Sequence, residues 1–311
     1  MTDRKDLVII GSGPAGLSAA VYAQRAMLDQ VVIEKEPFSG GQIITTERID
    51  NYLGLYGMGG YELAMKFREH ADALSVPFLE GEVTAINDDG EVKQITLASG
   101  ETIETKAVLF ATGARHKTLS VKGEKELAGA GVSYCATCDG AFFRGKTTAV
   151  VGGGDTALQD ALFLANTCRS VTLIHRRNAF RASPHLVSCA ERQENIRILR
   201  NYTVQKLLRL GDVLQGVELL NLETEETERL DMDGLFIAVG QAPQSAPFQE
   251  AVAVENGYYL AGEDTKTSLP GVFAAGDGRK KQVRQLTTAV SDGAAAALAA
   301  CRYLEEQGQS E

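Results

Sequence analysis

Two cysteines separated by two residues, Cys135 and Cys138, are the pair in this sequence best suited to redox chemistry. Cysteines at this spacing can close a small disulfide ring or open to a dithiol, whose thiolate form is the reactive one. The same spacing supplies half of many zinc sites, which need two further ligands. The remaining cysteines, Cys168, Cys189 and Cys301, are scattered and form no second pair. The sequence therefore favours a redox disulfide and predicts no metal site.

A carboxylic acid, Asp139, directly follows the second cysteine. An acid held beside a redox pair can protonate the thiolate that leaves during disulfide exchange, provided that burial keeps the acid protonated. The alternative is a structural role, in which the carboxylate caps the helix expected after the cysteine motif. The two roles are compatible, and the sequence leaves both open.

A glycine-rich motif near the N-terminus predicts a first nucleotide site. The apolar run 7–10 is typical of a parallel strand buried on both faces, and a helix is expected to follow it to about residue 26. Glu34 ends the next strand, 18 positions after Gly16, where a carboxylate can hold ribose hydroxyls while pyrophosphate rests on the helix N-terminus. The G-x-G-x-x-G motif between strand and helix consists of Gly11, Ser12, Gly13, Pro14, Ala15 and Gly16.

The same pattern begins again near residue 148, with a G-x-G-x-x-A motif over residues 152–157. At the offset of 18 positions from Ala157, the acid of the first repeat is replaced by His175, Arg176 and Arg177. Arginines bind a ribose 2′-phosphate through charge-assisted hydrogen bonds, whereas a carboxylate repels it. The first site therefore suits FAD and the second suits NADPH over NADH, the alternative for the arginines being a solvated basic face.

The two repeats also end alike, because residues 235–240 parallel residues 108–113. We interpret residues 115–242 as an NADPH-binding domain that carries the cysteine pair and is inserted into a discontinuous FAD-binding domain, residues 1–114 and 243–311. The predicted fold class is α/β, with two Rossmann-like, three-layer (ββα) nucleotide-binding domains. A chain of 311 residues is long enough for two such cores.

Composition excludes several classes of function. A formal charge of −10 argues against nucleic acid or an anionic membrane as the main partner. The N-terminus leads directly into a strand without a signal peptide, and no apolar run reaches the length of a membrane span. Five cysteines, an odd number, do not indicate a secreted disulfide framework. We therefore expect a cytoplasmic protein.

With these pieces in place, residues 7–304 resemble the low-molecular-weight thioredoxin reductases of the bacterial and plant type, class II of the pyridine nucleotide-disulfide oxidoreductases. The resemblance implies that hydride passes from NADPH to FAD, that electrons then reduce a Cys135–Cys138 disulfide, and that the dithiol reduces thioredoxin. It implies that Cys135 attacks the partner, that Cys138 faces the flavin, that Asp139 serves as the acid, and that the protein is a homodimer.

The resemblance also assigns cofactor contacts residue by residue. The positions implied to contact FAD are Gly11, Ser12, Gly13, Pro14, Ala15, Gly16, Glu34, Lys35, Gly41, Gln42, Asn51, Val83, Ala111, Thr112, Gly113, Gly276, Asp277, Arg284, Gln285 and Leu286. The positions implied to contact NADPH are Gly152, Gly154, Asp155, Thr156, Ala157, His175, Arg176, Arg177 and Arg181.

Some positions depart from the family pattern. Ala130 stands where an arginine docks thioredoxin in better-known members, and Ala141 replaces one of three aromatic residues after the redox motif. The alternative function is therefore an NADPH-dependent flavoprotein reductase of another thioredoxin-like or peroxiredoxin-type partner. A non-catalytic flavin or NADPH sensor is a further alternative, which the intact cysteine pair disfavours.

Overall fold

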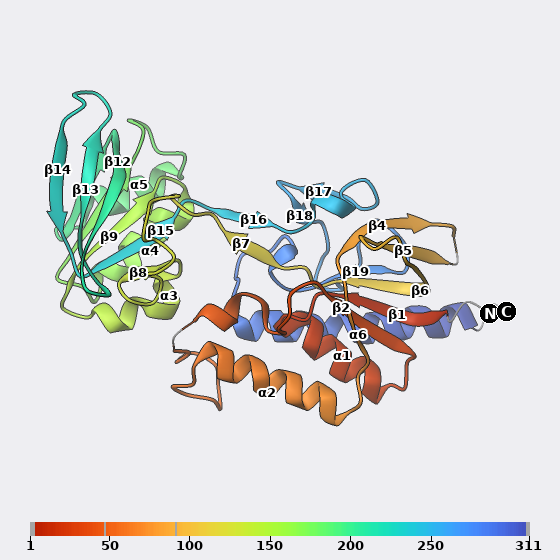
Figure 1. Ribbon diagram of the computed structural model, residues 1–311. Coiled ribbons are helices and arrows are strands. Elements are labelled where there is room, and N and C mark those ends of the chain that lie inside the picture. Colours follow the sequence, from red (N-terminus) through yellow and green to blue (C-terminus); the bar gives the residue numbers. More distant parts are fainter. Residues whose placement is uncertain (1–3, 47, 91, 309–311) are drawn as a thin grey trace. The chain divides into compact units, whose positions relative to one another are not determined.

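The computed structural model describes residues 4–46, 48–90 and 92–308 (Figure 1). The chain divides into two compact units. The first is made of the chain up to Arg115 and from Ala242 onward, and the second is His116–Gln241. The short strands β7 (Ala114–His116) and β16 (Gln241–Pro243) pair with each other where the chain passes between the units.

The first unit is built on one sheet with the strand order β3-β2-β1-β6-β5-β4, and β19 pairs with β6 outside this path. Strands β1, β2, β3, β6 and β19 are parallel, whereas β4 and β5 form an antiparallel hairpin against β6. Its elements are β1 (Lys5–Ile10), α1 (Pro14–Arg25), β2 (Gln30–Glu34), η1 (Gly41–Thr45), α2 (Gly60–Ala73), β3 (Phe78–Glu80), β4 (Val83–Asp88), β5 (Lys93–Leu97), β6 (Thr102–Phe110), η3 (Ala246–Phe248), β17 (Val254–Glu255), β18 (Tyr258–Tyr259), β19 (Val272–Ala274), η4 (Gly276–Gly278) and α6 (Leu286–Gly308).

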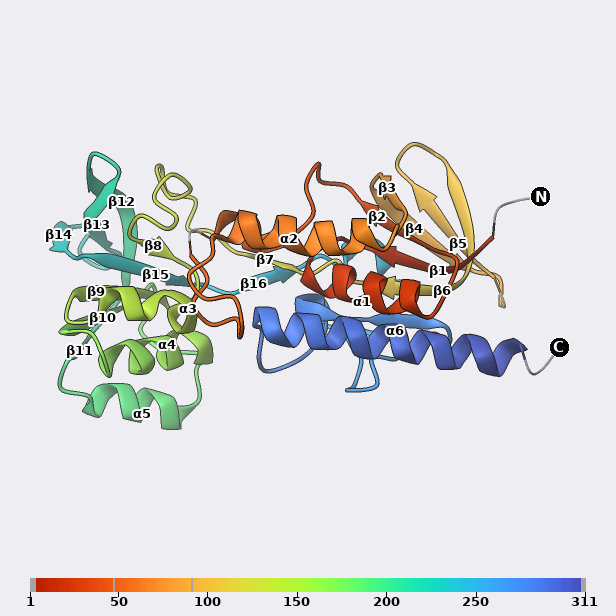
Figure 2. The same cartoon turned by 90° about the horizontal axis from the view of Figure 1, so that it is seen from below.

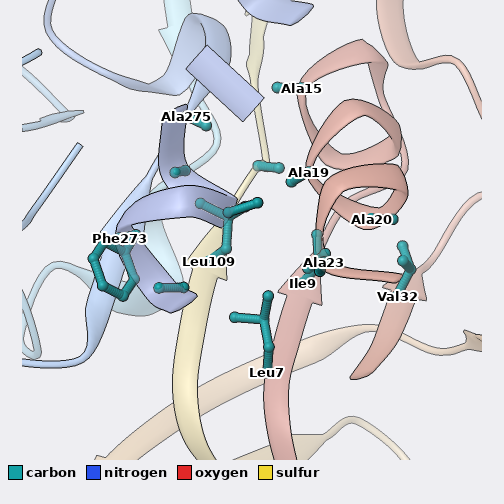
Figure 3. Close-up of a cluster of buried hydrophobic side chains, with 14 of the residues drawn as sticks. Leu7, Ile9, Ala15, Ala19, Ala20, Ala23, Val32, Leu109, Phe273 and Ala275 are labelled. Carbon is teal, nitrogen blue, oxygen red and sulfur yellow. The ribbon is translucent and has the colours of Figure 1, made fainter. Parts of the chain in front are cut away.

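Strand β1 is apolar on both faces because both faces of the sheet are covered. Leu7 and Ile9 join a core with α1, α2 and α6, whereas Val8 and Ile10 join a core with the β4–β5 hairpin. Figure 2 shows the three helices side by side along one face of the sheet. Figure 3 shows small alanine side chains of α1 in the same core as Leu7, Ile9, Leu109 and Phe273. The glycine turn after β1 is therefore held by a rigid strand and a rigid helix.

The C-terminal helix, α6, begins at Leu286. The backbone N–H of Gln285 donates to the Thr288 hydroxyl at 3.1 Å, which is one half of a capping box. This bond fixes the helix start directly after Gln285.

The second unit has a parallel sheet of order β11-β10-β9-β15-β8 and an antiparallel sheet of order β12-β13-β14. Within this unit, Figure 2 shows α4 and α5 on one side of the parallel sheet and the antiparallel sheet on the other. Its elements are β8 (Val132–Ser133), α3 (Ala136–Asp139), η2 (Gly140–Phe143), β9 (Thr147–Gly152), α4 (Asp155–Ala165), β10 (Ser170–His175), α5 (Pro184–Arg192), β11 (Ile196–Arg200), β12 (Tyr202–Leu210), β13 (Val213–Asn221), β14 (Thr227–Asp231) and β15 (Gly234–Ala238).

Side chains of β9 alternate between the two layers that cover the parallel sheet. Ala149 and Val151 pack with residues of the antiparallel sheet, and Val150 packs with α4. This gives the three layers, two of sheet and one of helix, that the repeat of the glycine motif predicts. The predicted fold class, α/β with two Rossmann-like units, is confirmed.

Candidate redox disulfide and nucleotide sites

Cys135 and Cys138 are bonded to each other through their sulfur atoms, with their Cα atoms 5.3 Å apart. The short helix α3 begins directly after Cys135, whose Sγ accepts the backbone N–H of Cys138 at 3.2 Å. The Thr137 hydroxyl lies 3.4 Å from the same sulfur. A donor aimed at a sulfur stabilises its thiolate form. When the disulfide opens, the local backbone therefore favours negative charge on Cys135.

Asp139 ends α3 and is half-buried. Its Oδ2 accepts the hydroxyl of Ser133 at 2.6 Å, a short hydrogen bond from the last residue of β8. The capping interpretation is wrong for the following helix, since Asp139 stands at the N-cap of η2 and makes no side-chain hydrogen bond to it. Ser133 was missed by sequence reasoning. Its only signal is a hydroxyl at the end of a strand, two residues before the redox motif.

In the turn between β1 and α1, the fold requires glycine at positions 11 and 16 but not at position 13. At Gly16 a Cβ would overlap the carbonyl oxygen of Gly11, and Gly11 itself has a φ of +103°. At Gly13 φ is −68° and a Cβ would meet no protein atom within 4 Å. Gly13 is also the N-cap of α1, with no side-chain cap bond and with Pro14 following. Open space above an uncapped helix N-terminus fits the approach of a pyrophosphate.

The acid predicted to hold a ribose lies beside this turn. One carboxylate oxygen of Glu34 accepts the backbone N–H of Ser12 at 2.7 Å and the Ser12 hydroxyl at 2.8 Å. The other oxygen accepts the backbone N–H groups of Lys35 and Glu36 at 2.9 and 3.0 Å. The backbone N–H of Gly81 donates to the Glu34 carbonyl at 2.9 Å, which brings the start of β4 to the same place. Glu34 is thus fixed in position before any ligand binds.

Other predicted positions gather around the same turn from distant parts of the chain. The backbone N–H of Gly40 donates to the Ser12 carbonyl at 2.9 Å, and a Cβ at Gly41 would lie 3.5 Å from the Gly13 Cα. A Cβ at Gly276 would lie 2.9 Å from that of Ala15. The structure therefore brings the glycine loop before Gln42 and the turn before Asp277 to the N-terminus of α1.

The remaining predicted FAD positions lie elsewhere in the first unit. The segment Ala111–Gly113 directly follows β6, and the Thr112 hydroxyl is 3.2 Å from that of Tyr259. Asn51 donates to the side-chain oxygen of Gln285 at 3.1 Å, directly before Leu286 opens α6. Val83 is 6% exposed in the core beside the β4–β5 hairpin, which leaves its backbone as the group available to a ligand.

Asp277 carries the clearest sign of a missing partner. Its Oδ1 is buried and has no hydrogen-bond partner among the described residues, and the nearest ammonium, that of Lys281, is 3.9 Å away. Burial raises the pKa of Asp277, while Lys281 and Arg284 lower it. The Arg284 guanidinium donates to the Asp277 carbonyl at 3.3 Å. A buried carboxylate oxygen without a donor is satisfied when a ligand hydroxyl occupies the site. These residues fit FAD, whose ribityl chain carries such hydroxyls.

The second glycine turn, between β9 and α4, likewise has one glycine that the fold requires, Gly152, and one that it does not, Gly154. At Gly152 a Cβ would overlap the Ala238 carbonyl oxygen and lie 2.6 Å from the Ala157 Cβ. At Gly154 φ is −101°, and a Cβ would meet nothing within 4 Å. Gly154 is the N-cap of α4 and has no side-chain cap bond. The side chain of Asp155 accepts the backbone N–H of Ser183 at 2.7 Å, and Thr156 is exposed on the first turn of the helix.

His175 and the arginines have different roles beside this turn. His175 is 6% exposed, its ring covers Gly153 and stacks on Phe180, and burial lowers its pKa. Its neutral form is thereby favoured, so it contributes shape more than charge. The side chains of Arg176, Arg177 and Arg181 are exposed, and the backbone N–H of Arg181 donates to the Gly153 carbonyl at 2.8 Å. Positive charge at the open turn therefore comes from arginines, which fits a phosphate-bearing nucleotide.

The other three cysteines take no part in these sites. Cys168 is buried in the core around α4, and Cys189 and Cys301 are partly exposed; each has a free thiol. Over the residues that the structure describes, every helix is too short or too polar to cross a lipid bilayer.

Comparisons with known proteins agree with this geometry. Residues 5–293 match the family described as pyridine nucleotide-disulphide oxidoreductase. The chain is 41% identical over 302 residues to the thioredoxin reductase of Bacillus subtilis (strain 168), which covers 97% of this chain and 95% of that relative. It is 42% identical over 308 residues to the bifunctional thioredoxin reductase/thioredoxin of Mycobacterium leprae (strain TN), which covers 98% of this chain and 67% of that relative.

Solved structures lead to the same group. The chain is similar to the crystal structure of thioredoxin reductase from Streptococcus pyogenes MGAS5005, with a TM-score of 0.93, 37% sequence identity, and coverage of 98% of this chain and 100% of that one. Identity of this degree over nearly the full length, together with the disulfide and both glycine turns, leaves one assignment. The chain belongs to the pyridine nucleotide-disulphide oxidoreductase family, among its low-molecular-weight thioredoxin reductases.

Proposed function

We propose that this chain reduces the disulfide of thioredoxin with electrons that come from NADPH and pass through FAD and the Cys135–Cys138 pair. The observation that carries the proposal is the disulfide itself, which is closed at the start of α3 in a chain that also holds two open glycine turns. We assign FAD to the first unit and NADPH to the second. The assignment follows from the acid, Glu34, at one turn and the arginines at the other.

FAD, when bound, accepts hydride from the nicotinamide and supplies an electron pair to a disulfide. The residues that would hold it are Gly13 at the open turn, Glu34 with its fixed carboxylate, and Asp277 with its unsatisfied oxygen. NADPH is a substrate, whose pyrophosphate would rest at Gly154 and whose 2′-phosphate would pair with Arg176, Arg177 and Arg181. Two parallel N–H donors on each guanidinium match the oxygens of a phosphate.

The disulfide exchange uses three residues in different roles. The Cys135 thiolate attacks one sulfur of the partner disulfide, which forms a mixed disulfide and releases the other partner sulfur as a thiolate. Cys138 then attacks the Cys135 sulfur, which closes the enzyme disulfide and releases the second partner sulfur. Asp139 donates a proton to one departing thiolate, and the proton that the Cys138 thiol loses on attack goes to the other. The partner leaves as a dithiol with two electrons and two protons gained, and the enzyme returns to the disulfide.

The partner, the oligomeric state and the location are parts of the same proposal. The printed name of the Mycobacterium leprae relative joins thioredoxin reductase and thioredoxin, which supports thioredoxin as the partner. The resemblance to the family supports a homodimer. A cytoplasmic location agrees with a dithiol pair that must be kept reduced, since cytosolic reductants hold thiols in that state.

An anaerobic titration with NADPH tests the proposal. The unaltered protein should be yellow with bound FAD and should take up one more electron pair than the Cys135→Ser/Cys138→Ser double variant. With thioredoxin present, the unaltered enzyme should oxidise NADPH continuously, and the double variant should not. Equal electron uptake by both proteins, or thioredoxin reduction by the double variant, would refute the proposal. If the enzyme reduces a peroxiredoxin-type partner but not thioredoxin, only the assignment of the partner would change.

A further inference from the structure

Ser133 contacts both Cys135 and Asp139 from the end of β8, the edge strand of the parallel sheet. It is 5% exposed and is the last residue of β8, where it pairs with Phe236 of β15 in the parallel sheet. The pairing anchors the Ser133 backbone in the sheet, directly before the segment that carries Cys135, Cys138 and Asp139. The roles proposed above for Cys135, Cys138 and Asp139 do not involve this residue.

The hydroxyl of Ser133 makes contacts that span the motif. It donates to Asp139 Oδ2 at 2.6 Å, and it accepts the backbone N–H of Cys135 at 3.0 Å. The Cys135 carbonyl oxygen lies 3.4 Å from the same hydroxyl and is a second possible acceptor. A serine hydroxyl has one donor and two acceptor positions, so it can exchange one arrangement for another by rotating its hydrogen.

This set of contacts serves Asp139 in both of its protonation states. When Asp139 is ionised, the hydroxyl donates to it. When Asp139 is protonated, the acid donates to the hydroxyl, whose hydrogen turns to the Cys135 carbonyl. The bond from the Cys135 N–H persists in both arrangements. A half-buried acid that exchanges a proton in every cycle is thereby paired with Ser133 before and after the transfer.

We propose that Ser133 is a positioning residue for disulfide exchange, which holds the Asp139 carboxyl group beside the cysteine pair and keeps it hydrogen-bonded in both protonation states. This inference rests on the proposed function, in which Asp139 donates a proton to the departing thiolate. Ser133 itself forms and breaks no covalent bond. The proton that leaves Asp139 goes to the partner sulfur, and the hydroxyl hydrogen stays on Ser133.

Other titratable groups near the motif must be separated from Asp139 in a pH experiment. α3 contains Cys138 and begins directly after Cys135. β8 is followed by Tyr134, whose hydroxyl donates to Glu124 at 2.8 Å. α4 packs against α3 and carries Asp155 and Asp160; burial raises the pKa of Asp160 to about 7. The 3-10 helix η2, also packed against α3, carries no titratable residue, and Arg144 follows its end. Asp160 is therefore the main competitor for a titration near neutral pH.

The matched pair Ser133→Thr and Ser133→Val tests the proposal, because the two side chains have nearly the same shape and only threonine keeps the hydroxyl. The measured quantity is the single-turnover rate at which NADPH-reduced holoenzyme reduces thioredoxin, recorded over a range of pH in an Asp160→Asn background. Ser133→Ala is measured in parallel as a smaller variant. Ser245→Ala is the control, since Ser245 is also buried and donates to the Gly257 carbonyl in the other unit.

Without the hydroxyl, both forms of the Asp139 carboxyl lose a hydrogen bond. The bond to the ionised form is charge-assisted and therefore stronger, so its loss disfavours the ionised form. The pH above which exchange slows should therefore rise by about one unit in Ser133→Val and Ser133→Ala, and the rate at its optimum should fall about tenfold. Ser133→Thr and Ser245→Ala should behave as the parent. In an Asp139→Asn background, Ser133→Val should add no further change. Reduction of the flavin by NADPH should be the same in every variant.

Several results would overturn the inference while leaving the proposed function intact. An unshifted pH midpoint in Ser133→Val would do so, whether or not the rate falls. So would a Ser133→Thr variant as slow as Ser133→Val, or an additive loss in the Asp139→Asn background. If Asp139→Asn itself leaves the rate unchanged at every pH, the assigned acid is wrong and the inference fails with it. Thioredoxin reduction without Cys135 and Cys138 would instead refute the proposed function.

Discussion

The carboxylate of Asp292, on the second turn of α6, accepts the backbone N–H of Gly276 at 3.1 Å, and so fixes the turn that presents Asp277. The same carboxylate accepts two hydrogen bonds from the Arg279 guanidinium, at 2.8 and 3.2 Å, and one from the Lys281 ammonium at 3.0 Å. The side chains of all three ion-pair partners are about nine-tenths buried. Asp292 is therefore the shared counter-charge of two buried cations beside the turn of the proposed flavin site.

Replacing Asp292 with alanine should destabilise the first unit and weaken flavin retention. The change leaves Arg279 buried without its counter-charge and Lys281 with only its 3.9 Å contact to Asp277. Breaking a buried ion pair on one side costs about 3–5 kcal/mol. It also frees the Gly276 N–H and thus the position of Asp277. Urea unfolding followed by circular dichroism, and release of FAD followed by its fluorescence, measure the two effects on the holoenzyme.

A matched control comes from the exposed pair between Arg229 and Asp231, whose 2.6 Å contact lies largely in solvent. Asp231→Ala should change the free energy of unfolding by less than about 1 kcal/mol and leave FAD bound. Equal, small effects in Asp292→Ala and Asp231→Ala would show that the buried cluster is not a determinant of the flavin site.

The repeated strand, glycine turn and helix could be predicted from the sequence because each signal is local. The apolar run 7–10, the glycines and the offset of Glu34 lie within one short segment. Ser133 and Asp292 could not be predicted in this way. Asp292 is a single acid in an alanine-rich helix, and only the fold shows that Gly276 and Arg279 face it. Residues that meet only in the tertiary structure have no characteristic spacing in the sequence, so the sequence alone does not reveal their contacts.

Arg176→Ala/Arg177→Ala should remove most of the preference for NADPH over NADH, mainly by raising KM for NADPH. We expect a preference of about a hundredfold in kcat/KM for the unaltered enzyme, since the loss of paired, charge-assisted hydrogen bonds to a phosphate costs a few kcal/mol. Steady-state kinetics with both nucleotides measure it. Arg229→Ala, an exposed arginine far along the same unit, is the control. An unaltered enzyme that uses both nucleotides equally would contradict the assignment of these arginines.

Gly154→Ala should impair NADPH binding, whereas Gly152→Ala should destabilise the fold. At Gly154 the backbone suits any residue and a Cβ meets open space, so the free energy of unfolding should change by only about 0.5 kcal/mol while KM for NADPH rises at least about tenfold. At Gly152 a Cβ collides with Ala238 and Ala157, so the fold itself should lose about 1–3 kcal/mol. Thermal unfolding without nucleotide, beside NADPH titrations, separates the two. Normal NADPH binding by Gly154→Ala would show that no ligand uses that space.

The last prediction concerns the order in which the two cysteines act. Cys135 Sγ accepts the Cys138 N–H at 3.2 Å, which favours its thiolate and supports its proposed role as the attacking group. Cys138→Ser should therefore form a stable mixed disulfide with a thioredoxin that lacks its own resolving cysteine, because nothing is left to attack the Cys135 sulfur. Cys135→Ser should form none, and both variants should still accept hydride from NADPH.

Non-reducing gel electrophoresis of each variant with that thioredoxin is the measurement, and Cys189→Ser, at a partly exposed free cysteine, is the control for unspecific cross-linking. A trapped complex with Cys135→Ser but not with Cys138→Ser would reverse the two roles. It would also mean that the hydrogen bond from the Cys138 backbone does not select the nucleophile, so that access of the partner, more than thiolate stability, decides which sulfur attacks. If neither variant forms a trapped complex, Cys135 and Cys138 do not take part in the exchange.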